Sequence, residues 1–127
     1  MSKLDFKKMG GLIPVITQDH ATNEILMQAF VDEVAVEKTL ETGDAHYFSR
    51  SKNRIWKKGE SSGHVQKIKE ILVDCDNDSI VFKVEQLGGA ACHVGYNSCF
   101  YRRITSDGSF QMLDKEKVFD PDKVYSH

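Results

Sequence analysis

The sequence lacks a long hydrophobic run, a strong charge excess and a disulfide-rich set of cysteines. No apolar stretch reaches the about 20 residues of a membrane-spanning helix, and residues 1–8 are too charged for a signal peptide. A net charge of -2 gives no general attraction to nucleic acid or to a membrane surface. The 3 cysteines, an odd number, favour reduced thiols over a disulfide framework. We therefore expect a cytoplasmic protein that binds neither nucleic acid nor membrane.

The composition that remains is typical of one soluble globular domain. The 127 residues include 40% hydrophobic and 28% charged residues, which suits one hydrophobic core rather than two. No internal repeat or low-complexity segment interrupts the chain. We expect a single domain over residues 1–127.

Strand-like runs dominate the first hundred residues. Apolar or alternating patterns predict strands at 12–16, 25–30, 46–49, 67–76 and 80–85. Turn-forming residues at 19–24 predict a hairpin between the first two strands, and Pro14 is expected near a strand start or at a sheet edge.

One helix is predicted after Asp32, which has the side chain of a helix N-cap. Glu33 places an acid in the first turn, where it complements the helix dipole, and Gly43 is a typical C-terminal stop. The apolar stripe that we expect to face the core consists of Ala35, Val36, Thr39 and Leu40.

Residues 74–103 hold the densest set of potential metal ligands. If 67–76 is a strand, Asp74 and Asp76 share one face and Cys75 points to the other. A turn that includes Asp78 follows, so the pattern predicts a hairpin with three carboxylates at its tip. Such a cluster favours a hard cation, Mg²⁺ or Ca²⁺.

Thiols and an imidazole follow within the same stretch. Cys92 and His93 are adjacent, Cys99 lies six residues after His93, and three glycines around Cys92 allow the loop geometry that ligation needs. With Cys75 as a third thiolate, these residues favour zinc. His93 is either the fourth ligand of a closed structural site or a base beside a zinc-activated water. We favour the base, because adjacent residues seldom reach one ion together.

Two structural alternatives compete with these metal sites. Each cysteine taken alone is an ordinary buried core residue. The acidic run also approaches an EF-hand loop, with Glu85 at the twelfth place. Ser79 stands where that loop requires glycine, and strands rather than helices are expected on both sides, so we disfavour the EF-hand.

The most basic segment runs from residue 50 to 58. Its cations, together with the serines and glycines that lie between residues 49 and 63, are typical of phosphate binding, although a solvated charged loop has the same composition. Trp56 at its centre is a core anchor or a surface for base stacking, and the core is the simpler expectation. No chemistry is assigned to residues 104–127.

Five segments together resemble the phosphoribosyl-AMP cyclohydrolase family of histidine biosynthesis. They are GLIPVITQD, ILMQAF, KTLETGDAHYFSRSKNRIWKKGESSGHVQ, DCDND and GGAACHVGYNSCFYR, and they span about residues 11–103. The tail at 104–127 lies outside the match. The chain leaves no room for the phosphoribosyl-ATP pyrophosphohydrolase domain that some members carry, so the resemblance implies a monofunctional form.

The resemblance implies an α+β, mainly β fold: a compact β pseudo-barrel with one capping helix, in an intertwined homodimer. It implies one zinc ion per subunit, shared across the dimer by Cys75, Cys92 and Cys99. It also implies one Mg²⁺ per subunit, held by Asp74, Asp76 and Asp78.

The implied reaction opens the adenine ring of 1-(5-phosphoribosyl)-AMP between N1 and C6. The ribosylated ring is cationic, so C6 is electrophilic towards a zinc-activated water, and His93 moves the proton. We expect His64 and Gln66 beside the purine and the basic segment on the phosphates. The expected substrate-binding residues are Arg50, Ser51, Arg54, Trp56, Lys57, Ser61, Ser62, His64 and Gln66. The alternatives are a zinc-stabilised structural or binding module and a zinc nucleobase deaminase.

Overall fold

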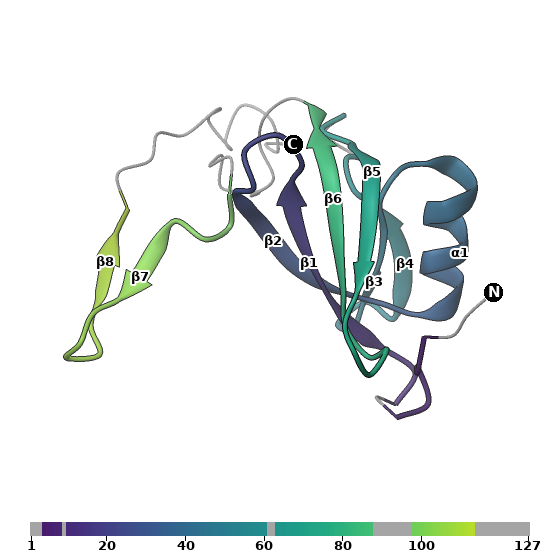
Figure 1. Cartoon of the computed structure of the whole chain (residues 1–127), viewed down its shortest axis with the longest axis horizontal. Helices are drawn as coiled ribbons and strands as arrows, with labels where there is room; N and C mark the ends of the chain where they lie inside the picture. The colour runs from purple at the N-terminus through teal and green to yellow at the C-terminus, as the bar shows by residue number, and fades with distance from the viewer. Residues whose placement is uncertain (1–3, 9, 61–62, 88–97, 114–127) are drawn as a thin grey trace.

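The computed structural model describes residues 4–8, 10–60, 63–87 and 98–113. These residues form a mainly β protein with one short helix (Figure 1). The strands are β1 (Ile13–Asp19), β2 (Ile25–Val31), β3 (His46–Ser49), β4 (Arg54–Lys57), β5 (Gln66–Val73), β6 (Ile80–Gln86), β7 (Arg102–Ile104) and β8 (Phe110–Met112), and the helix is α1 (Glu33–Thr42). No helix among these residues has the length and apolar character of a membrane span.

Six strands make one sheet in the order β4-β3-β2-β1-β6-β5. Neighbours are antiparallel except β1 and β6, which run parallel. The predicted hairpin of β1 and β2 is confirmed. Its turn is held by the Asp19 carboxylate, which accepts hydrogen bonds from the backbone N–H groups of Ala21 and Thr22 at 3.1 and 2.8 Å. Pro14 lies near the start of β1, as expected, just before the pairing with β6 begins at Val15.

The sheet curls until its β5 edge reaches the segment that leads into β3. Ala45 N–H donates to Gln66 O at 2.9 Å, and Ile68 N–H donates to Gly43 O at 2.8 Å. The result is a half-barrel, which confirms the mainly β architecture with one helix. Its interior is filled by the core-facing residues Ile13, Val15, Leu26, Met27, Val31, Tyr47, Ile80, Phe82 and Val84.

Helix α1 has the predicted caps. Asp32 Oδ1 accepts from Ala35 N–H at 2.8 Å, and Gly43 takes the left-handed conformation at φ 77°. Ala35, Val36 and Thr39 are buried, but Leu40 is 57% exposed, so its assignment to the core stripe was wrong. Leu40 lies about 40° further round the helix than Val36, beyond the face that packs on the sheet.

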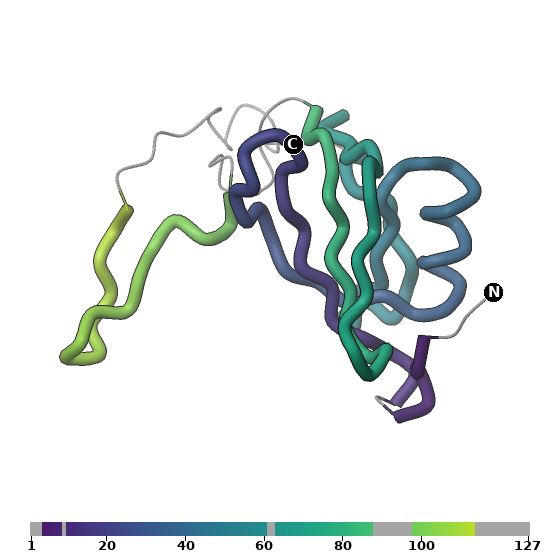
Figure 2. The backbone as a smooth tube through the Cα atoms, viewed as in Figure 1, coloured from purple at the N-terminus to yellow at the C-terminus, as the bar shows by residue number. Residues whose placement is uncertain are grey.

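Two elements differ from the sequence-based expectation. Part of the predicted phosphate-binding segment is the edge strand β4 rather than a loop. The hairpin of β7 and β8 includes the start of the tail, to which no structure was assigned, and it stands apart from the curled sheet (Figure 2). Three-residue strands with fully exposed patterns carry almost no signal in sequence.

Candidate functional site

The three predicted carboxylates do come together, but not through strand alternation. β5 ends at Val73, so Asp74, Asp76 and Asp78 lie in the turn that joins β5 to β6. Asn77 enters the left-handed region at φ 65°, and Asp74 Oδ1 accepts from Asp78 N–H at 3.0 Å. One ligand oxygen from each aspartate lies within 4.8 Å of the others. Strands rather than helices flank the turn, which is not the framework of an EF-hand.

The chain's own cation approaches this cluster, which we call the acidic triad. Lys8 Nζ lies 3.2 Å from Asp76 Oδ2 and 3.0 Å from Asp78 Oδ2. These contacts raise the pKa of Lys8 and lower the pKa of Asp76, whereas partial desolvation and the neighbouring carboxylates raise the pKa of Asp74. Clustered oxygens that already attract a cation fit a hard divalent ion of the Mg²⁺ type. Among the described residues, no other cluster of potential metal ligands occurs.

The two described cysteines lie at opposite ends of the sheet. Cys75 is exposed in the β5–β6 turn, and Cys99 is exposed beside the start of β2, where its N–H donates to Leu26 O at 2.6 Å. The register of the paired strands separates Cys75 from Leu26 along the strand direction. At about 3.3 Å per residue, this separation is roughly 15 Å. Zinc–sulfur bonds are about 2.3 Å long, so one chain cannot place both sulfurs on one ion. Cys92 and His93 lie outside the described residues.

Arg50 and Ser51, at the turn between β3 and β4, line an open depression of about 500 Å³. Gln28, Ala29 and Phe30 form its other wall. The Arg50 guanidinium lies 4.1 Å from the centre of the Phe30 ring, a cation–π contact that orients the positive charge. The depression therefore offers a preoriented cation and a hydroxyl to an anionic group.

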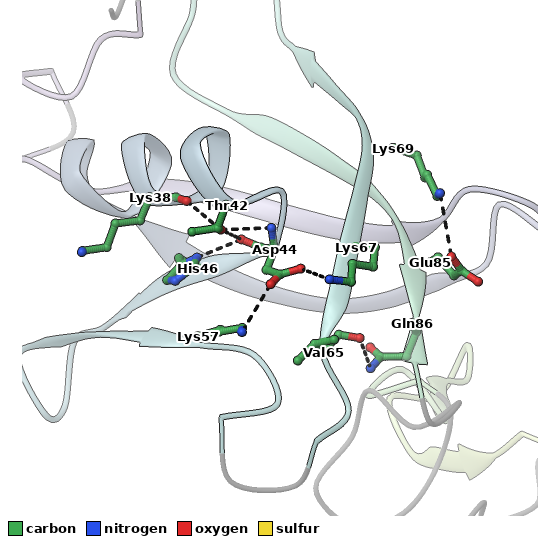
Figure 3. A network of polar contacts seen from close by, with 10 residues as sticks. All are labelled: Lys38, Thr42, Asp44, His46, Lys57, Val65, Lys67, Lys69, Glu85 and Gln86. Atoms are coloured by element: carbon green, nitrogen blue, oxygen red, sulfur yellow. Dashed lines mark hydrogen bonds and ion pairs between the residues drawn. The ribbon is translucent and has the colours of Figure 1, made fainter.

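The other expected phosphate ligands are engaged within the chain. Arg54 pairs with Glu60 at 2.7 Å, and Lys57 lies 3.3 Å from Asp44 Oδ2 (Figure 3). Asp44 also contacts Lys67 at 2.8 Å, so this nearly buried carboxylate joins β4 to β5. The hydrogen bond from Lys67, followed by that from Lys57, lowers the pKa of Asp44 against the opposing effect of burial. Lys57 lies at the opposite end of β4 from Arg50, so the basic segment is not one continuous patch.

The other residues expected beside the substrate do not form one described surface. Trp56 is half-buried, and its ring centroid lies 5.0 Å from that of Tyr47, which agrees with the core interpretation. Ser61 and Ser62 lie outside the described residues. His64 is half-buried in the segment before β5.

Gln66 differs from expectation, because its side chain is fully buried. Its amide bonds to Tyr47 and Gln86 in the core, so a direct contact with the purine does not fit this fold. These partners were not predicted from the sequence. The available signal was Gln86 itself, a polar residue that continues the core-facing alternation of Ile80, Phe82 and Val84.

Comparison with known proteins identifies the family. Residues 27–101 match the model of the family described as phosphoribosyl-AMP cyclohydrolase. The phosphoribosyl-AMP cyclohydrolase of Desulforapulum autotrophicum is 59% identical over 125 residues, which cover 98% of this chain and 99% of that protein. The protein of the same name from Methanoregula boonei is 60% identical over 116 residues, covering 91% and 89% of the two chains. The Geobacter sulfurreducens protein is 55% identical over 125 residues, covering 98% of each. The chain therefore belongs to the phosphoribosyl-AMP cyclohydrolase family.

Proposed function

We propose that this chain opens the adenine ring of phosphoribosyl-AMP at a zinc site built by two subunits, with Mg²⁺ at the acidic triad. The family makes the chain a hydrolase of histidine biosynthesis that acts on phosphoribosyl-AMP. The metals, the shared site and the residue roles are the finer parts of the proposal. They rest on the positions of the described residues and on the resemblance of the motifs.

The separation of Cys75 from Cys99 is the observation that carries the shared site. Both residues are exposed, and they lie at opposite ends of one sheet. A second copy of the chain can bring its own Cys99 to Cys75, whereas a single copy cannot. We infer that Cys75 of one subunit joins Cys92 and Cys99 of the other around each ion.

The hairpin of β7 and β8 offers a surface for that second copy. It follows Cys99 directly and projects from the half-barrel (Figure 1). Ile104, Phe110 and Met112 are 71%, 65% and 53% exposed. A two-stranded ribbon is marginally stable alone, so covering these side chains with a second subunit stabilises both the ribbon and the dimer.

The proposed chemistry assigns a task to each group of residues. Zinc, when bound with an open coordination position, makes water a nucleophile near neutral pH. His93 takes the proton from that water and can return it as the N1–C6 bond breaks. Arg50 and Ser51 bind an anionic group of the substrate in their depression, and the acidic triad holds Mg²⁺ near a second one.

Mixing two inactive variants tests the shared site. Cys75→Ser and Cys99→Ser homodimers should each lose zinc and activity. After joint refolding, half of the dimers are mixed, and each mixed dimer has one intact set of ligands. About a quarter of the wild-type activity should therefore return. Mixed dimers that form, as seen by native mass spectrometry, but remain inactive would mean that each zinc site lies within one chain.

Product analysis separates the proposed reaction from deamination. Ring opening by water retains all nitrogen atoms in the product, whereas a nucleobase deaminase releases ammonia. Turnover of phosphoribosyl-AMP should therefore change the ultraviolet spectrum of the base without a rise in ammonia. Stoichiometric ammonia release would contradict the proposal.

A further inference from the structure

We propose that Gln86 is a positioning residue for the reaction. Its side chain joins the segment before β5, which carries His64, to the end of β6 and ties both to the core. The inference concerns a residue that the proposed function leaves without a role. It rests on that proposal for the task of His93 and on the expected position of His64 beside the purine.

The series of hydrogen bonds that leads to Gln86 starts deep in the half-barrel. Tyr47 is fully buried, and its hydroxyl lies 2.7 Å from Thr17 Oγ1. Burial raises the pKa of Tyr47, so its hydroxyl stays protonated and donates to Gln66 Oε1 at 2.5 Å. Because one hydroxyl has one proton, Thr17 must donate to Tyr47. The directions of these bonds are therefore fixed.

The orientation of the Gln66 amide sets the orientation of the Gln86 amide. With Gln66 Oε1 occupied by Tyr47, its amide nitrogen donates to Gln86 Oε1 at 2.8 Å and lies 3.4 Å from Met27 Sδ. Gln86 Oε1 is thus an acceptor, which turns the Gln86 NH₂ group towards the end of the sheet. The amide of Gln86 cannot flip without losing the bond to Gln66.

The Gln86 NH₂ group holds two backbone segments at once. It donates to His64 O at 2.7 Å and to Leu87 O at 3.1 Å. Val65 O lies beside them, 3.4 Å from the amide nitrogen (Figure 3). Two N–H bonds thus satisfy the two nearer carbonyls. β6 ends at Gln86, and the bonds of its side chain lie beside a backbone hydrogen bond between the same two segments, from Leu87 N–H to Val65 O at 2.8 Å.

Gly59 fixes the same peptide from another side. Its φ is 88°, and a Cβ there would lie 2.5 Å from His64 C and 2.4 Å from Val65 N. The His64–Val65 peptide therefore lies between a closely approaching backbone and the Gln86 amide. Such double support is what a residue needs to keep a neighbouring side chain in one place.

The hydrogen bonds of Gln86 lie next to two segments that are expected to take part in the reaction. His64 is held directly through its own carbonyl. Leu87 is the last described residue before the segment that carries Cys92 and His93 in the sequence. One side chain therefore connects the segment of His64, which is expected beside the purine, to the start of the segment that carries His93, to which the proposed function assigns proton transfer.

A pair of matched variants tests the inference in the zinc-loaded enzyme. Gln86→Met removes the hydrogen-bond donors and the acceptor of the side chain at similar size. Tyr47→Phe removes one hydroxyl at the other end of the same series of hydrogen bonds. Both should lower the melting temperature. Only Gln86→Met should lower kcat, on the order of 10- to 100-fold, because the reacting groups lose alignment. Tyr47→Phe should keep kcat and KM within about twofold.

Gln86→Glu separates the two halves of the side chain. It keeps an acceptor for Gln66 but loses the donors to His64 and Leu87, so its kcat should fall as in Gln86→Met. Amide hydrogen exchange gives a readout that does not depend on turnover. Exchange at Leu87, whose N–H donates to Val65 O at 2.8 Å, should rise in both Gln86 variants and stay unchanged in Tyr47→Phe.

Two results would overturn the inference. One is a loss of kcat that is proportional to the fall in melting temperature in both the Tyr47 and the Gln86 variants, because this result indicates a purely structural network. The other is unchanged exchange at Leu87 in the Gln86 variants. Failure of the cysteine mixing experiment would remove the shared zinc site but would leave both of these readouts intact.

Discussion

Asp44 organises two strands with a single nearly buried carboxylate. One oxygen contacts Lys67 on β5 and the other contacts Lys57 on β4, across the seam where the curled sheet approaches itself (Figure 3). Both ammonium groups stay partly in water, so they keep most of their hydration while the carboxylate gains two charged partners. The seam is therefore stabilised only while Asp44 is ionised.

Asp44→Asn should make this dependence visible. The lysines lower the pKa of Asp44 below its ordinary 3.8, so its contribution is complete above about pH 5 and is lost as the pH falls through the lowered value. Urea unfolding at pH 7 should show a loss of about 1–3 kcal/mol. The difference from the wild type should shrink below about pH 4.

Glu85→Gln is the matched control for this experiment. Glu85 pairs with Lys69 at 3.8 Å, and both side chains are exposed, so its removal should change stability by less than about 1 kcal/mol. A constant gap between Asp44→Asn and the wild type from pH 7 to pH 3 would contradict the ionic role of Asp44.

Lys8 is placed to compete with a divalent ion for the acidic triad. Its ammonium group lies against Asp76 and Asp78, two of the proposed Mg²⁺ ligands, so a divalent ion must compete with it. Lys8→Met should tighten Mg²⁺ binding by about two- to tenfold, the scale of exposed ion pairs. Isothermal titration calorimetry at fixed ionic strength measures this change.

Lys7→Met removes the same charge from the neighbouring exposed residue. It controls for the general effect of net charge on cation binding. Equal affinities in the two variants would mean that Lys8 acts only through long-range charge. Weaker binding in Lys8→Met would mean that Lys8 helps to build the site.

Among the elements, the hairpin of β7 and β8 has the least support from the part of its chain that the structure describes. Its paired residues Ile104 and Phe110 place two apolar side chains next to each other in solvent. Arg102 lies 5.2 Å from the Phe110 ring and 5.3 Å from the Tyr101 ring, so aromatic rings also hold the base of the hairpin in order. The element is ordered locally and lacks a covering surface among the described residues.

Ile104→Ser and Phe110→Ser should weaken the proposed dimer. Each removes apolar area that we expect the second subunit to cover, worth about 1.5–3 kcal/mol, or roughly 10- to 100-fold in the dissociation constant. Sedimentation velocity over a concentration series measures the change. Gln111→Ser, between Phe110 and Met112 on the alternate face of β8, should leave the dissociation constant unchanged. Equal dissociation in all three variants would place the dimer interface elsewhere.

At the scale of the whole molecule, the core and the proposed zinc site are separate. Most buried hydrophobic residues of the half-barrel come from β1, β2, β3, β6 and α1, and neither described cysteine belongs to them. The fold therefore has its own hydrophobic stabilisation. Zinc is expected to join subunits and to serve the reaction rather than to build the core.

Chelation of zinc should separate these roles. Activity on phosphoribosyl-AMP should disappear and the dimer should weaken, whereas the strand signal in circular dichroism should persist. Added zinc should restore activity and assembly together. Loss of the strand signal on chelation would favour a structural zinc module instead.

The sequence by itself determined the features that depend on near neighbours. The caps of α1, the β1–β2 turn and the acidic turn after β5 follow from residue types a few positions apart, and the motifs from residue 11 to 103 were enough to identify the family. Tertiary structure decided the rest. Gln66 is buried, Asp44 joins two strands, and Cys75 lies far from Cys99 because each depends on how distant strands pair and curl. Strand register and curvature are set by the packing of the whole core, which local patterns do not encode.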